Sequence, residues 1–150
     1  MWHKLFVKYG LVAGTSTIAL FLLFYLLAPQ GMLHPAVWWG SLIIYISCMW
    51  IAGRRGRQSA STAPSFRQLM QFTFPVFVVA NVVFYTFWYL LLQYDSQLVE
   101  LQYEALRQGG WQGQMEDLAP RLGTFVWTLL QSFLGGAILS ALLAWGLKEE

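Results

Sequence analysis

The sequence predicts an all-α fold, an integral membrane bundle of four transmembrane helices with a short helical extracytoplasmic loop. The first observation is composition: of 150 residues, 57% are hydrophobic and 11% are charged, whereas soluble domains are about 25% charged. The second is that the charged residues leave three long uncharged stretches, 9–53, 68–94 and 122–147. A chain with so few charges cannot cover its surface in water, so we expect its solvent to be lipid.

The uncharged stretches divide into four spans. About 20 predominantly apolar residues cross the roughly 30 Å of hydrocarbon in a bilayer, so the second and third stretches are one helix each. The first stretch is long enough for two helices, and Pro29 and Pro35 end one and begin the next. We therefore expect a single membrane domain, 1–150, with spans at about 9–28, 36–53, 69–92 and 124–147.

The first span is expected to be a retained helix and not a cleaved signal peptide. Lys4 and Lys8 give it a positive start, as in a signal peptide. Its apolar segment is longer than the usual 7–15 residues, however, and Leu26 stands where a cleavage site needs a small residue.

Basic residues are concentrated at one predicted end of the bundle. Seven fall in the tails and the 54–68 loop: Lys4, Lys8, Arg54, Arg55, Arg57, Arg67 and Lys148. The 93–123 loop has only Arg107 and Arg121, beside five acidic residues. Because cytoplasmic loops carry the excess of Lys and Arg, we expect both termini and the 54–68 loop to be cytoplasmic. Tryptophans near the predicted span ends, which prefer interfaces, agree: Trp38, Trp39, Trp50, Trp127 and Trp145.

The first polar loop, 54–68, is predicted to lie at the membrane surface. We expect Arg54, Arg55 and Arg57 to contact anionic headgroups, at about 1 kcal/mol each; a site for a phosphorylated ligand is the alternative. Ser65 is expected to cap the next helix.

In the outer loop, 93–123, helical spacing runs from Asp95 to about Gln108 and breaks at Gly109-Gly110, with a second short helix after Gly113. We expect this outer loop to extend the third span outward and then fold back over the membrane surface, anchored by Trp111. Its acidic pairs are interpreted as a solvated face, with a divalent cation site as the alternative.

No chemistry-bearing constellation stands out. The four spans contain no Asp, Glu, His, Lys or Arg, which pumps and intramembrane hydrolases normally need. The lone Cys48 has no base nearby, and His3 and His34 lie on opposite sides of the predicted membrane. We therefore expect no catalytic residue, no cofactor and no metal, and the net charge of +2 is too small to favour a nucleic-acid partner.

Asn81 is the one carboxamide near the centre of the third span. An unpaired amide costs several kcal/mol in hydrocarbon, so Asn81 is expected to face another helix or a water pocket. A pore-lining role is the alternative.

The clearest constellation is a packing one. The fourth span has a small residue at every fourth position, which we call the small-residue stripe: Thr124, Thr128, Ser132, Gly136, Ser140 and Ala144. The first span has Gly10, Gly14 and Thr17. Helices in lipid associate where small side chains let backbones approach. Whether the stripe packs within the chain or between subunits stays open at this point.

These features together resemble a four-span bacterial membrane family catalogued as domain of unknown function 4199. The resemblance rests on Gly10 to Gly14, on Gly53-Arg54-Arg55, on Ser65-Phe66-Arg67-Gln68, and on an acidic outer loop before a Gly-rich last span. Thr73 departs from the family, which commonly has glycine there. The resemblance implies a bacterial inner-membrane location and supplies no activity or catalytic residue.

The sequence therefore predicts a non-enzymatic integral membrane protein, a structural or accessory subunit that acts through helix–helix assembly. Its expected partners are a lipid bilayer with anionic headgroups and either further copies of itself or a larger membrane complex. The alternative is a small transporter or channel formed by oligomerisation.

Overall fold

The computed structural model describes the backbone of residues 2–149 and the side chains of residues 4–149, and this part of the chain is helical with no strand. Its elements in chain order are α1 (Trp2–Leu27), α2 (Pro29–Met32), α3 (Pro35–Gln58), α4 (Phe66–Tyr94), α5 (Ser96–Gln108), the 3₁₀ helix η1 (Met115–Leu118) and α6 (Leu122–Glu149). The predicted all-α class is confirmed.

Four of these helices are long and apolar enough to cross a membrane: α1, α3, α4 and α6. They correspond to the four expected spans, but each is longer than expected at one end or both. The largest difference is in α1, which begins at Trp2 and not at residue 9; α3 continues to Gln58 and not to residue 53. The predicted bounds followed the first charged residue, which limits the hydrocarbon-buried part of a helix and does not end its hydrogen bonding.

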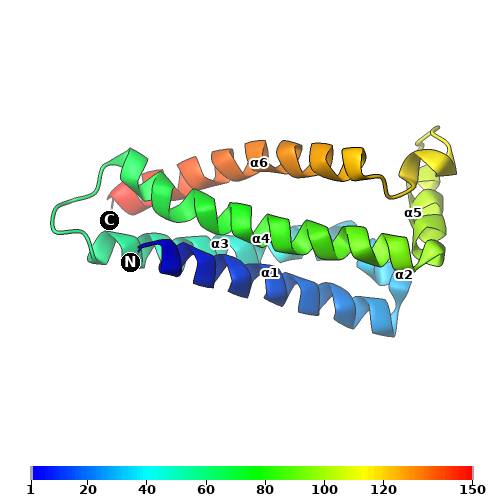
Figure 1. Cartoon of the computed structure of the whole chain (residues 1–150), viewed down its shortest axis with the longest axis horizontal. Helices are drawn as coiled ribbons and strands as arrows, with labels where there is room; N and C mark the ends of the chain where they lie inside the picture. Colours follow the sequence, from blue (N-terminus) through cyan, green and yellow to red (C-terminus); the bar gives the residue numbers. More distant parts are fainter. Residues whose placement is uncertain (1, 150) are drawn as a thin grey trace.

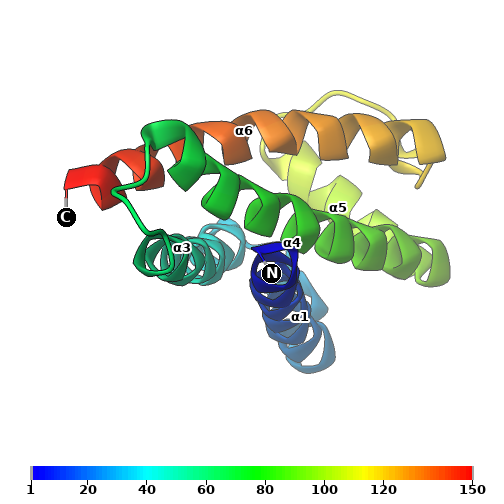
Figure 2. The same cartoon turned by 60° about the vertical axis from the view of Figure 1, so that its left-hand side comes forward.

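Helix α4 lies at the centre of the bundle (Figure 1). It contacts α1, α3 and α6, while α1 and α3 also contact each other. Helix α6 lies on the other side of α4 from α1 (Figure 2). Both chain ends and the 59–65 connection are at one end of the bundle (Figure 1), as four antiparallel spans require. We call this the basic end and the opposite one the outer end.

The seam between α1 and α4 is formed by two glycines. A Cβ atom on Gly10 would lie 2.5 Å from Cβ of Val79, and one on Gly14 would lie 2.9 Å from Cβ of Val83. Carbon atoms in contact are normally about 3.5–4.0 Å apart, so only glycine permits this approach. The expected close packing of the first span is therefore observed, and its partner is α4.

Local signals begin and end the helices as expected. Pro29 and Pro35 occupy first-turn positions of α2 and α3, and His34 Nδ1 accepts a hydrogen bond from the Ala36 N–H (3.2 Å). Ser65 caps α4 in a capping box: its hydroxyl accepts from the Gln68 N–H (3.4 Å), while the Ser65 N–H donates to Gln68 Oε1 (2.8 Å). Such pairs satisfy donors that a helix start leaves free.

The outer loop forms the expected helix, which folds over the outer end as expected but does so without first extending α4. Helix α5 turns across the outer end of the bundle instead of extending α4 (Figure 1). Asp95 makes the corner: its backbone is extended, and its carboxylate accepts hydrogen bonds from the Gln97 N–H (3.0 Å) and from the Tyr25 hydroxyl (2.7 Å). The expected break follows at Gly110, whose φ of 89° favours glycine.

Candidate functional site

The small-residue stripe of α6 lies against α4 of the same chain. A Cβ atom on Gly136 would overlap the ring of Phe77, lying 2.8 Å from its Cγ and closer still to Cδ1. Ser140 and Ala144, further along the stripe, are completely buried. This part of the stripe therefore packs within the chain and not between subunits, which the sequence had left open.

Toward the outer end the stripe opens. Thr128 is half-buried and Thr124 is exposed. Both line a cavity of about 420 Å³ beneath the outer loop, together with Trp88 on α4 and with Asp117 and Arg121 from the loop. The outer two residues of the stripe therefore border a space and are not packed on a helix.

Asn81 faces α6, as expected of an amide in the membrane. Its Nδ2 donates a hydrogen bond to Ser132 Oγ (3.1 Å), and the Ser132 hydroxyl donates in turn to the Leu129 carbonyl (2.6 Å). Asn81 is 5% exposed. The stripe and the amide, which the sequence presented as separate features, meet at Ser132.

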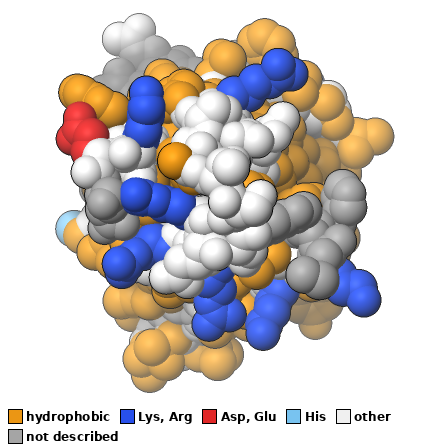
Figure 3. Space-filling view, turned by 90° about the vertical axis from the view of Figure 1, so that its left-hand side faces the viewer, with side chains coloured by type: hydrophobic (Ala, Val, Ile, Leu, Met, Phe, Trp, Pro, Cys, Tyr) orange, Lys and Arg blue, Asp and Glu red, His pale blue; other side chains and the backbone are white. Residues whose placement is uncertain are grey.

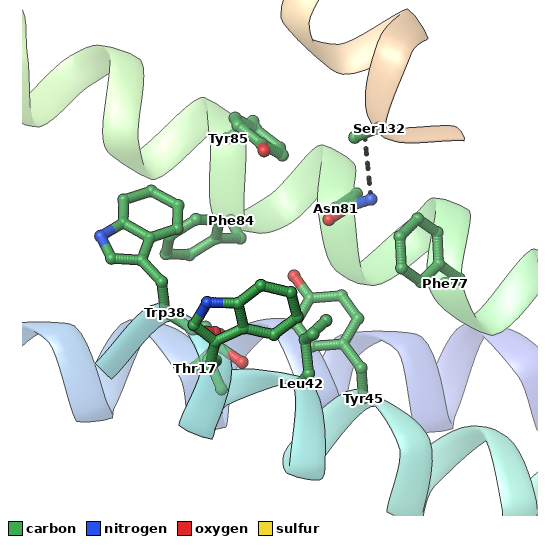
Figure 4. Close-up of a pocket in the computed structure, with 11 residues that line it drawn as sticks. Thr17, Trp38, Leu42, Tyr45, Phe77, Asn81, Phe84, Tyr85 and Ser132 are labelled. Atoms are coloured by element: carbon green, nitrogen blue, oxygen red, sulfur yellow. Dashed lines mark hydrogen bonds between the residues drawn. The ribbon is translucent and has the colours of Figure 1, made fainter. Parts of the chain in front are cut away.

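A cavity of about 280 Å³ adjoins this hydrogen bond, and we call it the Asn81 cleft (Figure 4). All four spans contribute to it: α1 provides Thr17, α3 provides Tyr45, α4 provides Asn81 and Tyr85, and α6 provides Ser132. Figure 4 shows the Tyr45 hydroxyl and the Asn81 carboxamide turned toward the same space. The cleft thus has a polar lining in the middle of the spans.

Aromatic rings border the outer side of the cleft. Trp38 packs edge-on against Phe21 (ring centroids 5.0 Å apart) and against Trp88 (5.2 Å), and Phe84 lies 4.9 Å from Phe21. The half-buried Trp38 therefore packs inward instead of anchoring the outer interface as expected. Trp39 is 71% exposed and lies at the rim of the cleft.

The three arginines expected at anionic headgroups, Arg54, Arg55 and Arg57, do not all have the same surroundings. All three lie on the last turns of α3 and not in a loop as expected. The Arg57 guanidinium donates to the Leu147 carbonyl near the end of α6, where a cation also favours the helix dipole. The Arg55 guanidinium lies 5.5 Å from the centre of the Tyr9 ring. Arg57 thus has a structural role, while headgroup contact by Arg54 and Arg55 stays a prediction.

The basic end carries these residues together with the lysines and Arg67. Lys and Arg side chains gather on this face of the molecule (Figure 3). The residues exposed there are Lys4, Lys8, Arg54, Arg55, Arg67 and Lys148. The acidic residues of α5 and η1 lie at the opposite end.

Among the side chains of residues 4–149, no three from His, Cys, Asp or Glu come close enough to hold a metal ion. Cys48 lies in the apolar core beside Met49 and Phe77. Among the described residues, none that could act as a base is in contact with the Cys48 thiol in this cluster.

Sequence reasoning missed the hydroxyl groups of the cleft. A signal was present, because Asn81 and Tyr85 are four residues apart on one helix and so are Ser41 and Tyr45 on another. Residues four apart share a helix face. Each pair on its own resembled ordinary packing, and only the fold brings the two faces together.

The four spans and the embedded cleft define an α-helical, multi-pass membrane protein. Residues 8–149 match the family described as "Protein of unknown function (DUF4199)", and the chain belongs to this family. The resemblance stated from the sequence is thereby confirmed. Neither a curated protein nor a solved structure matches the chain.

Proposed function

We propose that this protein is a non-enzymatic accessory subunit of a membrane that acts through helix–helix association, with a second copy of itself as partner. The contact surface is the outward face of α6 and not the part of the small-residue stripe from Ser132 to Ala144, which its own α4 covers. One observation carries the proposal: Gln131 is exposed on the surface of a membrane span.

The position of Gln131 follows from its neighbours. Ser132 bonds to Asn81 and Phe133 packs on the core, so Gln131, about 200° from Phe133 round the helix, lies on the opposite flank. It is nine residues beyond Leu122, or about 14 Å along a helix about 42 Å long. That depth is inside a hydrocarbon layer of about 30 Å.

A carboxamide at this depth needs a partner. Gln131 makes no hydrogen bond with the residues that the structure describes, and an unpaired amide in lipid costs several kcal/mol. The group has both a donor and an acceptor, so two copies related by a two-fold axis satisfy each other. The exposed residues beside it recur at intervals of three or four, as in a helix–helix seam: Thr124, Trp127, Gln131, Gly135, Ile138 and Leu142.

Oxidative cross-linking in lipid vesicles tests the proposal. In a background with Cys48→Ala, we expect Gln131→Cys to form disulfide-linked dimers. The control is Ile43→Cys, which is 68% exposed on α3 at a similar depth from the outer end and should stay monomeric. Gln131→Leu should weaken dimerisation, measured by energy transfer between labelled copies, about fivefold for about 1 kcal/mol of hydrogen bonding. Equal cross-linking at both positions, or unchanged association of Gln131→Leu, would contradict the proposal.

A transporter or channel formed by oligomerisation is the second candidate, and the Asn81 cleft favours it. From the cleft, a solute path toward the basic end is closed, because the Phe77 ring packs on Gly136 and lies 5.5 Å from the Tyr45 ring. Flux of small solutes into proteoliposomes separates the two candidates, because an accessory subunit gives no flux above empty liposomes.

The proposal includes a bacterial inner membrane with both termini in the cytoplasm. Its support is the charge asymmetry: seven basic residues belong to the basic end, and the outer loop has two beside five acids. The positive-inside rule applies to short loops of this kind. The absence of Asp, Glu, His, Lys and Arg from residues 9–28, 36–53, 69–92 and 124–147 supports a role without catalysis.

A further inference from the structure

The Asn81 cleft opens sideways, toward the bilayer. Helices α3 and α6 meet near the basic end, where Leu147 lies against Gly53 and Gly146 lies against Trp50. At the level of Ser132 and Trp39 the cleft lies between them, and Trp39 at its rim is 71% exposed. A molecule dissolved in the membrane reaches the cleft without crossing the outer loop.

Polar groups in the cleft lack partners. The Thr17 hydroxyl is buried, with 1% of the residue exposed, and has no hydrogen bond. The hydroxyls of Tyr45 and Tyr85 and the Oδ1 atom of Asn81 also make none with the described residues, although Asn81 Nδ2 is used by Ser132. Unpaired polar groups at this depth are costly. The Tyr45 hydroxyl and Asn81 Oδ1 turn toward one space, and Thr17 and Tyr85 are in its lining, which indicates a hydrogen-bonding occupant.

The lining also defines the chemistry of that occupant. None of the described residues lining the cleft is Asp, Glu, Lys, Arg or His, and an ion would be strongly destabilised there. Hydroxyls donate to carbonyl oxygens, and the Asn81 carboxamide oxygen accepts from hydroxyls. The walls include the rings of Trp38, Phe77 and Phe84, which suit a flat ring. A space of about 280 Å³ is at the small end of ligand pockets and holds a headgroup but no long tail.

We propose that the Asn81 cleft binds the ring of a lipid quinone or quinol, with the apolar tail lying in the bilayer beside Trp39. The ring lies among the aromatic side chains. Its oxygens accept from the Thr17, Tyr45 and Tyr85 hydroxyls in the quinone form, and a quinol hydroxyl donates to Asn81 Oδ1. No electron transfer is part of this proposal; the site binds and releases the molecule.

Radioligand binding to the full chain in phosphatidylcholine nanodiscs tests the site. The probe is tritiated decylubiquinone, a benzoquinone with a ten-carbon tail, and we expect saturable binding of one probe per chain. Tyr45→Phe and Thr17→Val each delete a hydroxyl that bonds nothing in the empty protein. Each should therefore weaken probe binding about fivefold while leaving the thermal stability of the empty protein unchanged or higher.

The control is Thr86→Val, because Thr86 is exposed on α4 and does not line the cleft; probe affinity should not change. Dioleoylglycerol, which is neutral but has no ring, and dioleoylphosphatidylglycerol, which is anionic, should not displace the probe. The proposal is overturned if uptake is non-saturable, if either lipid competes as well as unlabelled probe, or if Thr17→Val and Tyr45→Phe both bind like Thr86→Val. Dimerisation through Gln131 is measured separately, so either proposal can fail alone.

Discussion

Replacing Gly136 by alanine tests whether the seam between α4 and α6 is as tight as the structure shows. The added Cβ would lie 2.8 Å from Cγ of Phe77, against a normal contact of about 3.5–4.0 Å. The ring must therefore retreat by about 0.7 Å or more. It has little room, because Phe77 is 6% exposed and its ring is 5.5 Å from that of Tyr45.

The magnitude follows from two opposing effects. Overpacking a core costs about 1–3 kcal/mol, and a ring with no free space places Gly136→Ala at the upper end. Alanine is more favourable than glycine in a helix by about 1 kcal/mol. We therefore expect a net loss of about 2 kcal/mol. Gly40→Ala in α3 is the control: nothing lies within 4 Å of its added Cβ, so it should gain up to about 1 kcal/mol.

Reversible unfolding in mixed micelles, followed by circular dichroism, measures both variants. Phe77→Leu should remove most of the penalty of Gly136→Ala, with a coupling energy of about 1–3 kcal/mol in the double-mutant cycle. If Gly136→Ala is as stable as Gly40→Ala, or if the cycle shows no coupling, the stripe is not seated on α4 and the reasoning fails.

Two further predictions concern the ends of the bundle. Alkaline phosphatase fused at Gly110 should be active and fused at Ser59 inactive, and the opposite pattern would reverse the proposed orientation. Tyr25→Phe removes the 2.7 Å hydrogen bond to Asp95 that joins α1 to the α4–α5 corner, so it should lower the melting temperature by a few degrees. Tyr94→Phe, at a side chain that is 90% exposed, should leave it unchanged; equal effects would show that the corner bond contributes nothing.

The four spans were predictable because hydrocarbon excludes charge, so the uncharged stretches had to be the membrane-crossing segments. Local signals were equally readable: Ser65 and Gln68 form their capping box within four residues, whatever the rest of the fold does. Such features depend on residues that are close together in the chain.

The sequence did not predict which residues pack against each helix face. The spacing of Ser132, Gly136 and Ser140 defines a face of α6, but this spacing does not predict that Phe77 packs against it. The corner between α4 and α5 includes a hydrogen bond between Asp95 and Tyr25, which are 70 residues apart. The Asn81 cleft likewise requires four helices to contribute one polar group or more each.

The central position of α4 has a consequence for biosynthesis. Spans enter a membrane in chain order, and α1, α3 and α4 contact one another, so this three-helix unit can form before α6 enters the membrane. Helix α6 then docks on a surface that already exists. Until it does, the Nδ2 group of Asn81 lacks its Ser132 acceptor and faces lipid. A chain that stops before α6 therefore displays a mid-membrane amide to the quality-control machinery, and the arrival of the last span conceals it.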